Sequence, residues 1–185
     1  MKRKITVKPR FWILLVLLLA AGLTFLGFRL MDGRLSSFRY YNLEGLRTRI
    51  NTNLSDEGQT IQLSEFGTED VSYDSTSYQA YSAQTADWLF LAVTISENGE
   101  QTITVYFKKS VVSDGDLTDE TAQYQALIQS VLLTIDKSAD PAEFQSLQTS
   151  NYNPQYGTSN FTYGKYNYFV IDTQDSSALM ITKDK

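Results

Sequence analysis

The sequence predicts an α+β protein, in which an N-terminal transmembrane helix precedes a small two-layer domain of antiparallel strands with helices on one face. Three observations predict this class. An apolar run occupies residues 11–28, a strong hairpin pattern spans residues 88–107, and two helical patterns follow each other between residues 118 and 150. Strands joined by short turns pair antiparallel, and helices grouped in sequence tend to cover one face of a sheet.

The first element is a membrane anchor. Phe11 to Phe28 is apolar apart from Thr24 and two glycines, and about 18–20 apolar residues span a hydrocarbon core of about 30 Å. Trp12 lies at one edge, where an indole ring favours the interface. Five cations, ending with Arg10, precede the run, and Arg29 follows it. Positive charge stays in the cytoplasm, so we expect a single-pass cell-membrane protein with a cytoplasmic N-terminus and an extracytoplasmic C-terminal domain.

These features divide the chain into four parts. They are a basic cytoplasmic tail (1–10), a transmembrane signal-anchor helix (11–31), a juxtamembrane helix or linker (32–58) and an extracytoplasmic α+β domain (59–185). A cleaved signal peptide ending at Ala20-Ala21-Gly22 is the alternative. Apolar residues continue beyond that site, which favours the uncleaved anchor.

Residues 35–54 repeat apolar side chains at helical spacing, which predicts a helix. Thr60–Phe66 has the composition of a short strand, and weaker strand patterns begin at Val71 and span Tyr78–Tyr81. The clearest hairpin joins residues 88–96 to residues 101–107, where Ile103, Val105 and Phe107 alternate with polar residues. The intervening Asn-Gly pair is a strong hairpin signal.

Two helices are predicted next. Thr118 is the expected N-cap of the first, which carries an apolar stripe from Tyr124 to Ile135. Asp140-Pro141 followed by Glu143 predicts the start of a second helix, with Phe144 and Leu147 facing inward. Residues 150–165 are predicted to form a loop, and Tyr166–Thr173 and Ala178–Thr182 to form the last two strands, joined by a turn at residues 175–177.

Composition excludes several classes of function. Residues 32–185 hold ten of the sixteen Lys and Arg and all 21 Asp and Glu, a formal net charge of −11. Such a domain repels phosphate backbones, so we expect no nucleic-acid partner. The chain has no Cys and no His, which removes thiol chemistry and the commonest general base and zinc ligand. We expect no cofactor and no metal.

The strongest candidate contact surface is an aromatic tract between residues 151 and 169. Rings beside amide side chains stack on sugars or dock extended peptides. An ordinary polar loop followed by strand residues that face the core is the alternative. The ring residues proposed for this surface are Tyr152, Tyr156, Phe161, Tyr163, Tyr166 and Tyr168.

Other motifs are weaker. Four acids lie between Asp114 and Glu120, but the EF-hand positions for glycine and glutamate hold Asp119 and Gln125, so a solvated loop that caps the next helix is favoured over a calcium site. Asn53-Leu-Ser and Asn160-Phe-Thr match the N-glycosylation pattern. The basic anchor and small cysteine-free domain are typical of a bacterial protein, so we expect neither to be used.

The sequence contains no hydrolase or phosphate-loop motif of the common kinds. We therefore expect a non-catalytic interaction or accessory protein of the cell envelope, bound to the bilayer by its N-terminal helix, with a protein, peptide or glycan partner. The alternative is a cell-wall hydrolase or transferase that uses a carboxylate pair. A weaker third interpretation is a sensory ectodomain, which would need a membrane partner because its cytoplasmic part is only about ten residues long.

Overall fold

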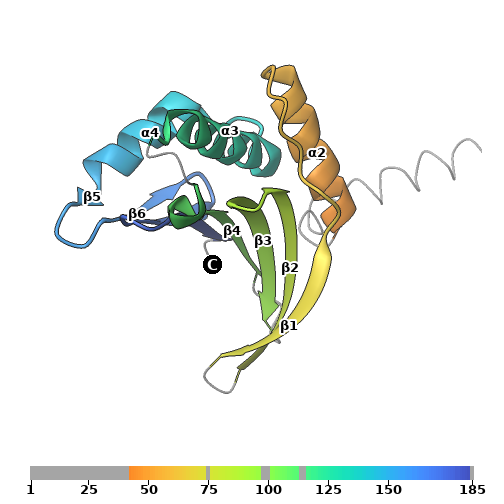
Figure 1. Ribbon diagram of the computed structural model, residues 1–185. Coiled ribbons are helices and arrows are strands. Elements are labelled where there is room, and N and C mark those ends of the chain that lie inside the picture. Colours follow the sequence, from red (N-terminus) through yellow and green to blue (C-terminus); the bar gives the residue numbers. More distant parts are fainter. Residues whose placement is uncertain (1–41, 74–75, 97–100, 113–115, 184–185) are drawn as a thin grey trace, which may run out of the picture. The chain divides into compact units, whose positions relative to one another are not determined.

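The computed structural model describes residues 42–73, 76–96, 101–112 and 116–183. The chain divides into two compact units, 1–41 and 42–185, and only the second is described. That domain is α+β, with one eight-stranded antiparallel sheet and three α-helices among the described residues (Figure 1). The elements are α2 (Leu43–Asp56), β1 (Gly67–Tyr73), β2 (Thr76–Ala86), β3 (Leu89–Ser96), β4 (Gln101–Phe107), the 3-10 turn η1 (Lys109–Val111), α3 (Thr118–Ile135), α4 (Pro141–Ser150), β5 (Tyr152–Asn153), β6 (Thr158–Tyr163), β7 (Tyr166–Asp172) and β8 (Ser177–Lys183).

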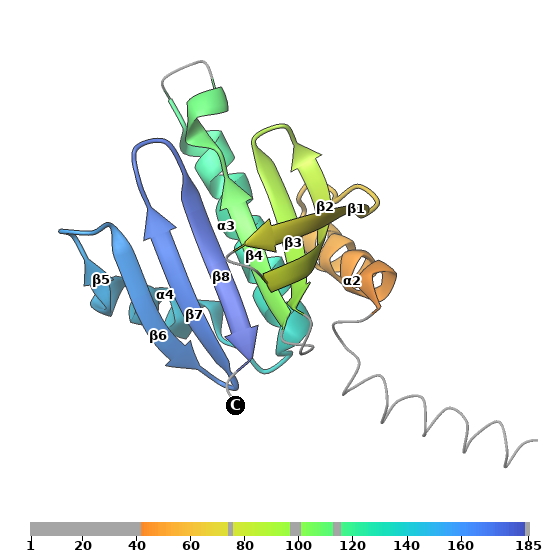
Figure 2. The ribbon, with the colours of Figure 1, turned by 90° about the horizontal axis from the view of Figure 1, so that it is seen from below.

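The sheet is built from two meanders. Its strand order is β1-β2-β3-β4-β8-β7-β6-β5, so the first four strands and the last four each run in sequence order and meet where β4 pairs with β8. The helices α3 and α4 lie between the two meanders in the chain. Figures 1 and 2 show the helices on one face of the sheet. In the view of Figure 2, the opposite face is seen over β8, β7 and β6, while β1 crosses in front of β3 and β4.

The core lies between the helices and the sheet. Alternate residues of β3, β4, β7 and β8 are buried, as a half-covered sheet requires. The apolar stripe predicted for α3 is confirmed, because Tyr124, Leu127, Val131 and Ile135 are all buried. Each of the three aliphatic side chains contributes about 1.5–3 kcal/mol on burial.

The predicted hairpin is confirmed by the pairing of β3 with β4, in which Leu91 lies opposite Val105 and Val93 opposite Ile103. The turn itself lies outside the described residues. The second helix also begins as predicted: Asp140 is the N-cap of α4, and its Oδ1 accepts a hydrogen bond from Ala142 N at 2.9 Å.

Three local predictions were wrong. Thr118 is the first residue of α3 and not its N-cap. The backbone N and the Oγ1 of Thr118 both donate hydrogen bonds to Asp116 Oδ1. The predicted loop at residues 150–165 contains β5 and β6. Residues 60–66 form no strand, because Leu63 bonds through its backbone to the side chain of Asn51.

Residues 35–41, the first part of the helix predicted at 35–54, lie outside the described residues, and α2 covers the remainder of that prediction. The weak patterns at Val71 and at Tyr78–Tyr81 fall in β1 and β2. The last two predicted strands correspond to β7 and β8, joined by a turn in which Thr173 N donates to Ser176 O.

Candidate functional site

The structure separates the six aromatic residues proposed as a contact surface. Phe161, Tyr166 and Tyr168 are buried, whereas Tyr163 is half-buried. Tyr152 and Tyr156 are 46% and 67% exposed. The prediction of one surface made by all six rings is therefore wrong for the buried three, because alternate positions of β6 and β7 face the helices.

The buried rings pack around Phe144 of α4. Its ring centroid lies 5.3 Å from that of Phe161 and 5.0 Å from that of Tyr168, both in edge-to-face geometry. Phe161 and Tyr168 are themselves stacked, at 5.5 Å. Burial raises the pKa of the Tyr168 hydroxyl above its ordinary value. These contacts make the cluster a part of the core that fixes α4 on the sheet.

Of the two exposed tyrosines, Tyr152 lies in β5 and Tyr156 in the β5–β6 turn, which is tightly held. Asn153 O accepts from Gly157 N at 2.9 Å, and Asn153 Oδ1 accepts from Gln155 N at 3.0 Å. Gly157 has φ +63°, and a Cβ there would lie 2.3 Å from the carbonyl oxygen of Asp172. Whether Tyr152 and Tyr156 contact a partner stays a prediction.

A larger surface lies on the uncovered side of the sheet. We call it the open face, and define it by the outward positions of β3, β4, β8, β7 and β6 (Figure 2). Residues paired across antiparallel strands share one face, so the register aligns the outward positions in three rows. The first row is Phe90, Tyr106, Ala178, Ile171 and Thr158; the second is Ala92, Thr104, Met180, Phe169 and Asn160; the third is Thr94, Thr102, Thr182, Asn167 and Thr162.

None of these fifteen side chains is charged, although 20% of the whole chain is Asp, Glu, Lys or Arg. Phe169 and Met180 lie opposite each other near the middle of the face and are 37% and 36% exposed. Phe90 and Tyr106 pack at 4.8 Å between ring centroids. Two rows are thus rich in apolar side chains, and the third carries four threonines and one asparagine.

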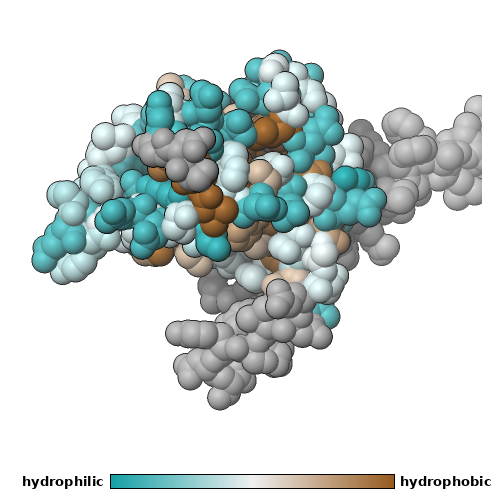
Figure 3. Space-filling model, viewed as in Figure 1, coloured by the Kyte–Doolittle hydropathy of each residue, from teal (hydrophilic) through white to brown (hydrophobic). Residues whose placement is uncertain are grey.

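The open face was not predicted, although its signal is present in the sequence. The non-core positions of the strands at 89–96, 101–107, 166–172 and 177–183 are uncharged between the strand ends. Figure 3 shows another side of the molecule, where the surface is mainly hydrophilic with small hydrophobic areas. The absence of charge is therefore a property of this face and not of the whole domain, whose residues 42–185 hold 8 Lys and Arg against 20 Asp and Glu.

One polar cluster combines a cation, a carboxylate and a hydroxyl. Asp172 Oδ1 accepts from Lys109 Nζ and from Ser177 Oγ, both at 2.5 Å. Burial raises the pKa of the Asp172 carboxyl, but the hydrogen bonds from Lys109 and Ser177 outweigh it and hold the pKa below its ordinary value. Lys109 Nζ also donates to Thr173 O at 2.9 Å. The cluster therefore clips η1 onto the β7–β8 turn, and its ionised carboxylate is unsuited to act as a general acid.

The acidic segment between Asp114 and Glu120 lies partly outside the described residues. Its described member Asp116 bonds to Thr118 at the start of α3, and these hydrogen bonds lower the pKa of the Asp116 carboxyl. Among the described residues, no group of three or more Asp and Glu side chains is placed to hold a metal ion. The described part of this segment therefore serves the helix start.

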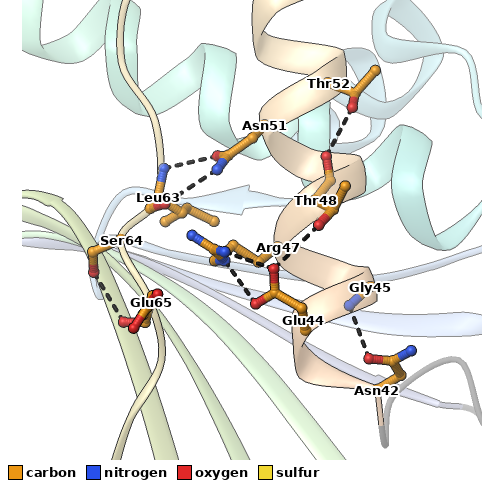
Figure 4. A network of polar contacts seen from close by, with 10 residues as sticks. All are labelled: Asn42, Glu44, Gly45, Arg47, Thr48, Asn51, Thr52, Leu63, Ser64 and Glu65. Atoms are coloured by element: carbon orange, nitrogen blue, oxygen red, sulfur yellow. Dashed lines mark hydrogen bonds and ion pairs between the residues drawn. The ribbon is translucent and has the colours of Figure 1, made fainter.

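The helix α2 carries a polar network along its exposed side (Figure 4). Asn42 Oδ1 caps the helix by accepting from Gly45 N at 2.9 Å. Arg47 Nη2 lies 2.6 Å from Glu44 Oε1, and this hydrogen bond lowers the pKa of Glu44 and raises that of Arg47. The positive charge of Arg47 is thus offset within α2.

Asn53, the acceptor residue of the first glycosylation motif, makes hydrogen bonds within the domain. Asn53 Nδ2 donates to Ser130 O at 3.2 Å and to Thr134 Oγ1 at 2.9 Å, which links α2 to α3. A glycan on this nitrogen would break that link. Asn160, in the second motif, is exposed on the open face.

The anchor residues Arg10, Trp12 and Arg29 lie outside the described residues, as does the whole run from Phe11 to Phe28. Within the part of the chain that the structure describes, no helix is both long enough and apolar enough to cross a membrane.

Comparison of the chain with protein-family models, with curated protein sequences and with solved structures gives no match. The open face and the chemistry of the described side chains are therefore the features that bear on function.

Proposed function

We propose that this chain is a non-catalytic interaction protein of the cell envelope, anchored by residues 11–31, and that the open face is its contact surface. One observation carries the proposal: fifteen outward side chains on five adjacent strands include no charge. Protein surfaces are about 25–35% charged, so fifteen neutral neighbours are unusual by chance. Uncharged faces with exposed apolar side chains are typical of contact sites.

Three of the described carboxylates have structural partners, and this favours the proposed function over hydrolysis. A hydrolase needs two carboxyl groups with separated pKa values on either side of a scissile bond. Asp136 Oδ1 accepts from Ser138 N, and Asp140 Oδ1 accepts from Ala142 N, so both serve turns and helix starts. Asp172 serves the clip with Lys109. None of these groups lies among the outward residues of the open face.

Crosslinking in cells tests the proposal. We expect the full chain to yield a specific crosslinked product, and Phe169→Lys to abolish it, because a lysine there places an unpaired charge in the centre of the face. Gln145→Lys, on the exposed side of α4, is the matched control and should leave the product unchanged. In parallel, the protein is incubated with insoluble cell-wall polymer. If no product and no retention on the polymer are found, the proposal fails.

The proposed location has its own test. A reporter fused after Lys185 should be active only outside the cytoplasm, because five cations before residue 11 keep the N-terminus inside. Activity of the reporter in the cytoplasm would contradict the anchored topology without affecting the open face.

A further inference from the structure

We infer that the occupant of the open face is a second copy of this chain, so that two domains pack sheet against sheet about a twofold axis. The inference rests on the proposed function, because it takes the open face as the contact surface. It adds the identity of the partner, which three properties of the face determine: its charge, its chemistry and its area.

The distribution of charge limits which surface of one copy can contact a second copy. Residues 42–185 carry a formal net charge of −12, so two copies repel each other through most orientations. The open face contributes no charge to that repulsion. In a twofold arrangement the same patch is used by both copies, so a neutral face meets a neutral face and no carboxylate is desolvated.

The chemistry of the face favours a protein partner over a sugar. Its most exposed apolar pair is Phe169 and Met180, and the neighbouring Ile171 and Ala178 are aliphatic. Sugars bind to flat rings flanked by amides. The Phe169 ring has Asn160 on one side, but Met180 and Ile171 beside it offer a sugar hydroxyl no strong hydrogen-bond partner. An axis that lies between the two faces, parallel to the strands and near the Phe169–Met180 pair, would set the two apolar rows against their copies. The threonine row would then lie at the rim, as in interfaces with an apolar core and a polar edge.

The area fits a weak dimer. Five strands at a spacing of about 4.8 Å, each about 20 Å long over the three rows, give an area of about 480 Å² per copy, measured along a sheet that Figure 1 shows to bend at β3. The two copies together bury at most about 960 Å² by this measure, at the lower limit of roughly 1,000 Å² for a specific interface. Two open sheet faces pack in this way in β-sandwiches, about 10 Å apart. The dimer should therefore depend strongly on protein concentration.

The absence of cysteine from the chain makes disulfide trapping the direct test. Full-length variants with one cysteine, at Thr104, Phe169 or Met180, are oxidised mildly in intact cells and separated on a non-reducing gel. Residues close to a twofold axis face their own copies, so we expect at least one variant to form a covalent dimer. Gln145→Cys, exposed on α4, is the matched control. Its dimer yield should be at least about tenfold lower.

A second substitution checks that the face, and not chance collision, gives the product. Adding Thr104→Lys to the Met180→Cys variant should lower the dimer yield at least about tenfold, because each lysine meets an uncharged surface. Far-UV circular dichroism of both proteins verifies that the fold is retained. Equal yields at Gln145 and at the open face, or no dimer from any of the three positions, would overturn the inference.

The two proposals fail in different ways. A photoreactive group on the Met180→Cys variant reports whatever lies on the open face. A product of twice the chain mass supports the second copy. A product with a different polypeptide overturns the second copy but leaves the interaction function standing, and no product of any kind overturns both.

Discussion

Asn51 holds the middle of the segment 59–66, whose flanking bonds run from Gln59 N to Leu54 O and from Ser64 N to Gln84 O. It lies on α2, and its Oδ1 accepts from Leu63 N at 2.8 Å while its Nδ2 donates to Leu63 O at 3.1 Å (Figure 4). This pair of bonds replaces the ladder that a strand would have made, and it brings the Leu63 side chain to 2% exposure. Replacing Asn51 with alanine should therefore loosen the segment around Leu63.

The Asn51→Ala substitution can lower the free energy of unfolding in two ways, and the smaller of the two losses is the one observed. If the segment stays in place, a backbone N–H and a carbonyl lose their partners, at about 1–3 kcal/mol each. If the segment detaches, Leu63 loses about 1.5–3 kcal/mol of burial. Alanine regains a few tenths of a kcal/mol as a better helix former. We expect Asn51→Ala to lower the free energy of unfolding by about 2 kcal/mol.

Urea unfolding followed by far-UV circular dichroism measures this change. Thr52→Ala is the matched control, since Thr52 lies next along α2 and its exposed hydroxyl donates only to Thr48 O. It should stay within about 0.5 kcal/mol of the unsubstituted protein. A loss below about 1 kcal/mol for Asn51→Ala, or one equal to that of Thr52→Ala, would refute the role given to the Asn51–Leu63 bonds.

Three further predictions concern the core, a turn and the polar clip. Phe144→Ala should lower the free energy of unfolding by about 3–5 kcal/mol in urea titrations, because its ring is the centre of the cluster under α4. Gly157→Ala should lower the free energy of unfolding in urea titrations more than Gly58→Ala does. Both glycines have a positive φ, but of the two only Gly157 would place a Cβ against backbone atoms. Equal effects would contradict the close approach. The lowered pKa of Asp172 stabilises the fold above its unfolded-state pKa of about 3.9, and this contribution is lost as the pH falls through the folded value. The stability difference between the protein and Asp172→Asn should therefore be largest above about pH 4 and shrink below it, whereas a constant difference from pH 2 to 7 would contradict the clip with Lys109.

Strong local signals made much of the fold predictable. Residues 101–107 alternate strictly and follow an Asn-Gly pair in the sequence, and α3 has an uninterrupted apolar stripe. The strand predicted at residues 60–66 failed for a tertiary reason, because a side chain of α2 satisfies the backbone of Leu63. A single-sequence pattern does not contain such a contact.

The composition of the aromatic tract at residues 151–169 predicted a contact surface, although half of the six proposed rings are buried. Its rings suggested a surface, but Phe161 and Tyr163 on β6, and Tyr166 and Tyr168 on β7, each follow the period of two that marks one face of a strand. That period also predicts β6, which the many Asn, Gly and Ser residues concealed. The open face was harder to find, since it is defined by pairing between distant strands and by the absence of charge.

The join between β4 and β8 has a consequence for how the chain reaches its native state. Within the described sheet, this ladder connects the two meanders, and its partners lie about 80 residues apart, as Ile103 and Ile181 do. Local hairpins close quickly, whereas so distant a pairing carries a larger loop-closure entropy. Each meander should thus form early and the central ladder late, as the slow step. A chain cut between α3 and α4 would then consist of two fragments that reassemble by complementation along this one ladder.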